Sequence, residues 1–264
     1  MISMASKQTS ERAFFGVSAL LFAASAAVTI VWCASMSGEM PMPGGWTMSM
    51  AWMRMPGQTW PGAAASFLAM WVVMMVAMML PSLVPMLLRY RQAVGRTGET
   101  RLGRLTALVG AGYFFVWTMF GMVVFPLGVA LATIEMRHPA LARAVPIAVA
   151  VVVLIAGSFQ FTRWKAWRLA CCRKAPADGL TLPADAGTAW RQGLKFGVYC
   201  AQCCAGLMAI LLVIGVMDLR AMAIVTAAIT IERLAPAGER IARGIGAFVL
   251  AAGLFLIARA AGLG

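Results

Sequence analysis

The stretch that decides the fold is residues 62–88, GAAASFLAMWVVMMVAMMLPSLVPMLL, which carries no charged side chain. A helix needs about 20 apolar residues to cross the hydrocarbon core of a membrane, so this stretch predicts a membrane-spanning helix. Six further apolar runs support the same interpretation. We expect an all-α polytopic bundle forming one integral membrane domain over residues 1–264, with about seven spans at Ala13–Ala34, Gly62–Leu88, Leu105–Ile134, Ala144–Phe161, Phe196–Met217, Leu219–Leu234 and Gly244–Ala261.

The overall composition agrees with a membrane protein and argues against a soluble one. The chain is 62% hydrophobic and only 12% charged, whereas in soluble domains about half the residues are apolar and about a quarter are charged. The net charge of +13 raises the question of nucleic-acid binding. The sequence contains no zinc-finger spacing, basic helix or phosphate-binding glycine loop, so we expect a lipid bilayer and no nucleic acid as partner.

The basic residues predict which way the bundle faces. If the N-terminus is inside, 17 lysines and arginines lie in inner segments and 5 in outer ones. Short cytoplasmic loops of membrane proteins carry such an excess of positive charge. The sequence therefore predicts an inside N-terminus, a basic inner loop at residues 162–195 and an outer loop at residues 35–61.

Three cysteines lie close together in the fifth span, in the run FGVYCAQCCAGLM over Phe196–Met208. Cys200, Cys203 and Cys204 are spaced i, i+3 and i+4, so on a helix their thiols share one face, and Met208 continues that face. Cys171 and Cys172 lie in the basic loop, where positive charge favours the thiolate that binds metals. We predict a soft-metal site from Cys200, Cys203, Cys204, Met208, Cys172 and Cys171.

Two other interpretations of the cysteines stay open. Cys200 and Cys203 form a C-x-x-C pair, which could work as an intramembrane thiol-disulfide oxidoreductase. Alternatively, the thiols pack as small apolar groups in a structural membrane subunit. The spacing fits neither a disulfide framework nor a zinc ribbon. Because His138 is the only histidine, we predict no Ser-His-Asp triad in this chain. We favour a protein that is not an enzyme.

Methionines add a second set of soft donors. The loop 35–61 carries Met40, Met42, Met48 and Met50 in close pairs, and its prolines and glycines predict a break in helical structure. Thioethers stay neutral and suit Cu(I), although the loop's tryptophans would equally anchor it at the membrane interface. In the second span, Met74 and Met78 share a helical stripe, and Pro81 and Pro85 predict a kink. These methionines either line a metal path or fill the packing.

Several of these motifs resemble a bacterial family of predicted metal-binding integral membrane proteins. The resemblance rests on Met70–Ser82, on Gln160–Lys165 followed by Cys172-Arg173, and on Gly197–Met208 with Gly215–Met217. The family pattern has a further cysteine where this chain carries Arg168, and a tryptophan where it carries Ala205. The resemblance implies metal binding in a multi-pass protein of the bacterial inner membrane.

Together these patterns predict an integral membrane protein that handles a soft metal, most simply Cu(I). It would act as a transporter or as a metallochaperone, with a copper enzyme or another chaperone as a possible partner. The outer methionines would collect the ion, the second span would pass it inward, and the cysteines would receive it.

Overall fold

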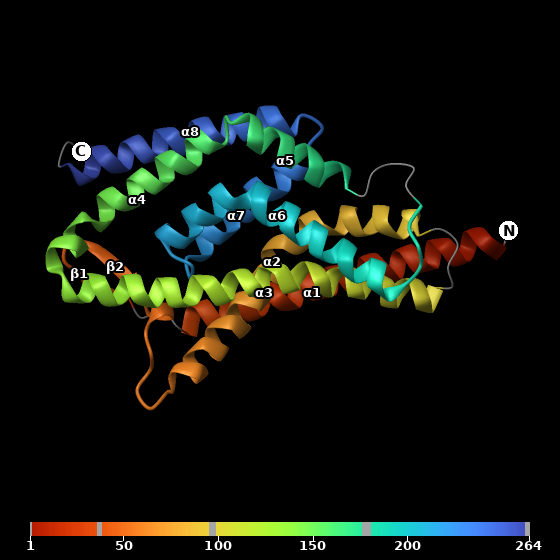
Figure 1. Ribbon diagram of the computed structural model, residues 1–264, viewed down its shortest axis with the longest axis horizontal. Helices are drawn as coiled ribbons and strands as arrows, with labels where there is room; N and C mark the ends of the chain where they lie inside the picture. The colour runs from red at the N-terminus through yellow and green to blue at the C-terminus, as the bar shows by residue number, and fades with distance from the viewer. Residues whose placement is uncertain (1, 36–38, 95–98, 176–180, 262–264) are drawn as a thin grey trace.

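The computed structural model describes residues 2–35, 39–94, 99–175 and 181–261. Eight helices, one two-stranded antiparallel sheet and a short 3-10 helix make up these residues (Figure 1). In chain order the elements are α1 (Ile2–Ser35), β1 (Glu39–Met42), β2 (Trp46–Ser49), η1 (Met50–Trp52), α2 (Trp60–Ala93), α3 (Glu99–Arg137), α4 (Pro139–Phe159), α5 (Arg163–Lys174), α6 (Ala186–Ile214), α7 (Leu219–Leu234) and α8 (Gly238–Ala260).

Six of the described helices, namely α1, α2, α3, α4, α6 and α8, are long and apolar enough to cross a membrane. This confirms the predicted all-α bundle and indicates a multi-pass membrane protein. The helix α7 has the bounds expected for the remaining span. However, its 16 residues rise only about 24 Å, which is shorter than the hydrocarbon core of about 30 Å.

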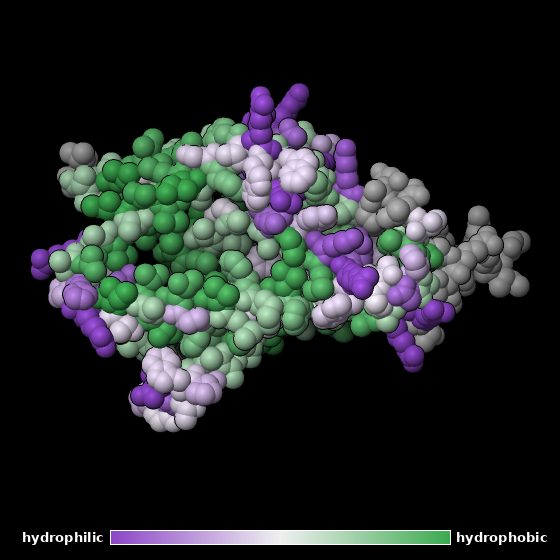
Figure 2. All heavy atoms as spheres, viewed as in Figure 1, coloured by the Kyte–Doolittle hydropathy of each residue, from purple (hydrophilic) through white to green (hydrophobic). Residues whose placement is uncertain are grey.

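Figure 2 shows apolar residues over much of the visible face, with hydrophilic residues gathered toward the end where the N-terminus lies and a smaller group at the opposite end.

The helices pack in pairs, which are antiparallel for α4 and α8 and parallel for α3 and α6. Figure 1 shows α4 and α8 side by side, and their close approach places Gly157 against Leu250 and Gly253 against Leu154. The helices α3 and α6 make the most extensive contact in the bundle. At their crossing, a Cβ on Gly193 would collide with the carbonyl oxygen of Val109. Glycine at this position lets the two backbones approach closely, as small residues do in membrane bundles.

The helix α2 continues through both of its internal prolines, Pro81 and Pro85. A proline inside a helix removes a hydrogen bond and bends the axis. Figure 1 shows α2 changing direction between its two halves, as the sequence predicts. The bend lies next to Met79, Ser82 and Met86, which are all buried.

Two segments expected to be loops have more structure than the sequence indicates. Residues 35–61 contain the β1–β2 hairpin, whose turn uses Gly44 and Gly45 at positive φ. The Trp46 indole N–H donates to the Ala142 carbonyl oxygen at 2.8 Å and joins the hairpin to α4. Residues 162–195 contain α5 and the first turns of α6. Short amphipathic or charged helices such as α5 lack the apolar length by which membrane spans are recognised.

The reversal between α6 and α7 has a clear local cause. Gly215 ends α6 with a φ of 148°, a conformation that side chains disfavour. Asp218 then begins α7 by accepting hydrogen bonds from the backbone N–H groups of Arg220 and Ala221. The turn sends α7 back along α6, so the end of α7 reaches the cysteines of α6.

Candidate metal centre

The three cysteines of α6 lie together inside the protein. Cys200, Cys203 and Cys204 are each no more than 2% exposed. The Cys204 sulfur lies 3.7 Å from the Cys200 sulfur and 3.6 Å from the Cys203 sulfur. Two thiolates that share one metal ion at about 2.3 Å lie about 3.8 Å apart when the angle at the metal is tetrahedral. The spacing of these sulfurs therefore matches that of neighbouring ligands of one ion.

Other elements bring further donor atoms to this cluster. From α2, the Met79 sulfur lies 3.9 Å from the Cys200 sulfur. From α3, the Tyr113 hydroxyl donates a hydrogen bond of 2.9 Å to the same sulfur. From α5, Cys172 is fully buried in the same core. Helices that are far apart in the sequence thus converge on Cys200.

A buried arginine occupies the middle of these sulfurs. Arg233, at the end of α7, donates to the Cys200 sulfur at 3.2 Å and to the Met86 sulfur at 2.7 Å. It also donates to the Ser82 hydroxyl at 2.7 Å. Among the described residues its side chain forms no salt bridge with a carboxylate. A buried guanidinium without a carboxylate partner needs other hydrogen-bond acceptors, and here they are two sulfurs and one hydroxyl.

Glu232, which precedes Arg233 in the chain, pairs with a lysine and not with Arg233. Glu232 pairs with Lys165 at 2.7 Å, and both side chains are 2% exposed. The Lys165 ammonium also donates to the backbone carbonyl oxygen of Cys203 at 2.5 Å. Lys165 belongs to α5, Glu232 to α7 and Cys203 to α6. The contacts of Lys165 therefore hold three helices together beside the thiols.

We predict that Lys165→Met strongly destabilises the protein. Removing one partner of a buried ion pair leaves an uncompensated charge, which costs about 3–5 kcal/mol and corresponds to roughly a 10 °C lower unfolding temperature. The thermal unfolding of the detergent-solubilised protein measures this change. The double variant Lys165→Met/Glu232→Gln should recover most of the loss. A single variant as stable as the parent would show that the pair does not hold the helices.

Cys172 lies at the side of the cluster that faces the basic segments. Its interaction with the Cys203 thiol, aided by the positive charge of Arg233, lowers the pKa of Cys172 against the opposing effect of burial. A cavity of about 20 Å³ reaches Cys172 and Met86 from between Arg89 and Arg173. This volume accommodates a single water molecule or ion. Cys172 is therefore a thiol of the cluster that has a lowered pKa and lies beside an opening.

The remaining predicted residues lie in three places. Met208 is buried one turn beyond Cys204, and Met74 and Met78 are buried in α2. Cys171 is half-buried beside Cys172. In the hairpin, Met40 pairs with Met48, which is 2% exposed, while Met42 in the hairpin and Met50 at the start of η1 are half-buried. The hairpin methionines are thus separate from the cysteine cluster.

Sequence reasoning missed several residues that meet at the cluster. They are Tyr113, Ser82, Met86, Lys165 and Arg233. A charged residue beside an apolar span, such as Arg233, is itself a signal of function. Sequence reasoning also missed a contact near the hairpin end of the bundle, where the Cys33 thiol lies 3.8 Å from the Met217 sulfur.

The cluster is not a complete metal site in this conformation. Within the described ranges, no group of three or more histidine, cysteine, aspartate or glutamate side chains is arranged to hold a metal ion. The thiols approach one another in pairs, and the guanidinium of Arg233 contacts Cys200 and Met86. The donor set is nevertheless thiol and thioether sulfur, the chemistry that selects soft ions such as Cu(I).

Comparison with known proteins agrees with this chemistry. Residues 68–256 match the model of a family described as PpoB2, copper chaperone. The matched region includes every residue of the cysteine cluster and excludes the β1–β2 hairpin. No curated protein and no solved structure shows significant similarity to the chain. Because the match extends over most of its length, this chain belongs to the PpoB2 copper chaperone family.

Proposed function

We propose that this protein binds Cu(I) through cysteine and methionine sulfurs within the membrane and transfers it along the bundle. The observation that carries the proposal is the meeting of Met79 and Cys200, whose sulfurs lie 3.9 Å apart. At this point the methionines of α2 join the thiols of α6. Membership of a copper chaperone family supports copper as the cargo.

The methionines of α2 form the proposed path. Five of them, namely Met70, Met74, Met75, Met78 and Met79, are buried in the ten residues that precede Leu80 and the bend at Pro81. Their thioethers are neutral, so a monovalent ion can move from one to the next without leaving strong charge behind. Methionine is also a common packing residue, so the number of methionines in α2 does not by itself indicate a metal path. The proposal depends instead on the contact between these methionines and the thiols of α6.

The two ends of the path have different donors. The hairpin end offers the thioethers of Met40, Met42, Met48 and Met50, and near it Cys33 contacts Met217. The other end offers Cys200, Cys203, Cys204 and Cys172. The distribution of basic residues supports a hairpin outside and cysteines near the inner face of a bacterial plasma membrane. We therefore propose that copper enters from the hairpin and reaches the thiols before its release to a partner copper protein.

Arg233 makes the thiol site suitable for a monovalent ion. A Cu(I) ion held by two thiolates carries one net negative charge, and the guanidinium supplies the matching positive charge. Unbalanced charge at a buried site costs several kcal/mol, so this balance matters to affinity. On binding, Arg233 would release the Cys200 sulfur while staying beside the complex as its counter-ion.

One geometric observation favours a second function, thiol-disulfide exchange. Sulfurs at 3.6–3.7 Å need to move by less than 2 Å to reach the disulfide length of about 2.05 Å. Oxidised and reduced protein can be compared by thiol trapping. Reversible loss of labelling in a protein that binds no copper would favour the oxidoreductase, and a cluster that can be removed without loss of function would favour a structural subunit.

A titration of purified, reduced protein with Cu(I) tests the proposal. A chromogenic Cu(I) competitor should report tight binding, accompanied by the ultraviolet charge-transfer absorption of copper thiolates. Ag(I) should compete for the same site because it is also soft and monovalent, whereas Mg²⁺ should not. Absence of Cu(I) binding, or displacement of Cu(I) by Mg²⁺, would refute the assignment.

A further inference from the structure

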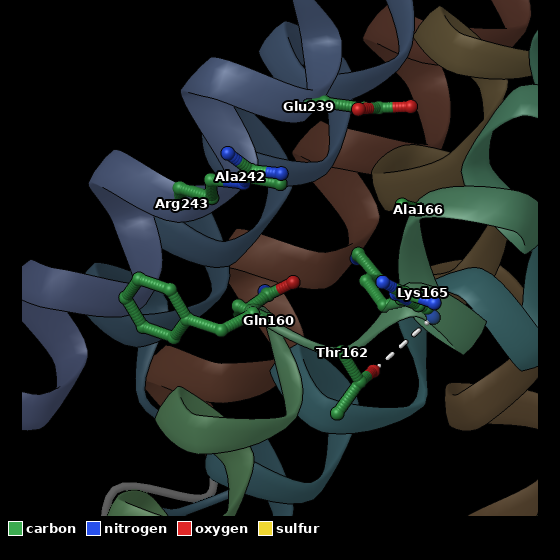
Figure 3. Close-up of a pocket in the computed structure, with 9 residues that line it drawn as sticks. Gln160, Thr162, Lys165, Ala166, Glu239, Ala242 and Arg243 are labelled. Carbon is green, nitrogen blue, oxygen red and sulfur yellow. Dashed lines mark hydrogen bonds between the residues drawn. The ribbon is translucent and has the colours of Figure 1, made fainter.

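A second polar site lies beside the cluster and takes no part in copper binding. A cavity of about 230 Å³ opens where α4 ends and where α5 and α8 begin. Its polar lining includes Gln160, Thr162, Arg163, Lys165, Glu239 and Arg243 (Figure 3). The space is several times that of a single water molecule, which occupies about 30 Å³ in the liquid. It is therefore large enough for a small polar group.

Gln160 is the strongest indication that the cavity has an occupant. The residue is only 4% exposed, and its amide acts on the nearby carboxyl of Glu232, but neither the amide oxygen nor the amide nitrogen has a hydrogen bond of normal geometry within the described part of the chain. Figure 3 shows the amide directed toward the space bounded by Ala166, Ala242 and Glu239. Buried polar groups nearly always have partners, so an amide facing a cavity points to a bound polar group.

The charges around the cavity favour an anion. Arg163 and Arg243 are exposed and line it from two helices, whereas Glu239 is the single carboxylate of the lining. The Lys165 charge is already balanced by Glu232. The cavity also faces the first turn of α5, where the Thr162 hydroxyl accepts from the Lys165 N–H at 3.2 Å. Other N–H groups of a first helical turn have no partner within the helix and attract anions.

The surroundings of the cavity resemble the surface region of a membrane protein. Trp164 and Trp167 project from α5 and are 41% and 56% exposed. The guanidinium of Arg168 stacks over both rings, at 5.2 Å and 4.5 Å from their centres. Tryptophans with this exposure gather at the level of the lipid headgroups. The anion chemistry and the level together match the phosphate of a phospholipid.

We propose that this cavity binds the phosphate of a phospholipid headgroup, with preference for an anionic lipid such as phosphatidylglycerol. Arg163 and Arg243 contact the phosphate oxygens, and the Gln160 amide N–H donates to the same group. The site anchors α5, the helix that carries Lys165 and Cys172, at the membrane surface. It does not depend on copper binding, so each proposal can fail while the other stands.

Native mass spectrometry of the full chain, released from mixed micelles, tests the proposal. The probes are phosphatidylglycerol, phosphatidylcholine and inorganic phosphate. We expect retention of phosphatidylglycerol over phosphatidylcholine, and about tenfold or more weaker retention in Arg163→Gln/Arg243→Gln, because charge-assisted hydrogen bonds to phosphate are strong. The matched control is Arg137→Gln/Arg143→Gln. It removes two exposed arginines where α3 ends and α4 begins, at the opposite end of α4 from the cavity.

Gln160→Leu provides a second variant that keeps both arginines. It should weaken lipid retention, because the amide N–H is lost as a donor to the phosphate. Equal retention in all variants, or equal loss in the control, would overturn the proposal. Binding of inorganic phosphate without lipid retention would also overturn it, since the occupant would then be a soluble anion. Retention of neither probe would show that the cavity holds water only.

Discussion

A protein carrying Cys203→Ser and Cys204→Ser should lose most of its Cu(I) binding, with affinity lowered about a hundredfold or more. Cys204 is the thiol that approaches both of the others, at 3.7 Å and 3.6 Å. Replacing it together with Cys203 leaves Cys200 and Cys172 as the only thiols of the cluster and removes both short sulfur–sulfur approaches among the described cysteines of α6. A hydroxyl is a hard donor and does not replace thiolate at a Cu(I) site. Competition titration with a chromogenic Cu(I) ligand measures the change.

The control must remove two thiols without touching the cluster. Cys33→Ser/Cys171→Ser does so, because Cys33 lies near the hairpin end and Cys171 is the half-buried neighbour of Cys172. We expect this variant to retain the high-affinity site. Serine replaces cysteine with little change in volume, so both variants should fold. Unchanged Cu(I) affinity and stoichiometry in the Cys203/Cys204 variant would reject the cluster as the binding site.

Arg233→Gln should lower Cu(I) affinity by about two orders of magnitude. The substitution keeps hydrogen-bond donors near Ser82 but removes the positive charge that balances a copper dithiolate. About 2.7 kcal/mol corresponds to a hundredfold in affinity, and the cost of unbalanced buried charge is at least of this order. Arg233→Lys keeps the charge and should restore most of the binding. A shift in relative affinity away from Cu(I) and Ag(I) should accompany the loss in Arg233→Gln.

An increase in the Cu(I) affinity of Arg233→Gln would also be informative. If the guanidinium only blocks the sulfurs of Cys200 and Met86, its removal should free them and tighten Cu(I) binding. Tighter binding in Arg233→Gln would therefore contradict the role of Arg233 as a counter-ion. It would leave the thiols themselves as the binding site, so the two predictions can be judged separately.

The sequence predicts the bundle and the common face of the thiols because both depend on local periodicity. An apolar run such as residues 62–88 shows its environment directly, and the i, i+3, i+4 spacing of Cys200, Cys203 and Cys204 places them together on any helix. The bend at Pro81 and Pro85 is likewise a local effect. The hairpin is less predictable because it depends on Gly44 and Gly45 and on a distant contact between Trp46 and Ala142.

The partners of the thiols could not be predicted because they come from other helices. Nothing near Tyr113 or Met86 in the sequence shows that either side chain reaches the cluster. The pairing of Lys165 with Glu232 leaves Arg233 free for the sulfurs, although Glu232 and Arg233 are adjacent in the chain. Such choices depend on tertiary packing. The shortness of α7, by contrast, was visible in the sequence, and it places Arg233 at the level of Cys200.

X-ray absorption at the copper edge of the Cu(I)-loaded, full-length protein tests the central claim most directly. The account predicts a first shell of sulfur alone, at about 2.3 Å as for other metal–thiolate bonds. It also predicts that this shell disappears in Cys203→Ser/Cys204→Ser. A first shell of nitrogen or oxygen in the unsubstituted protein would contradict the assignment of copper to the sulfur cluster.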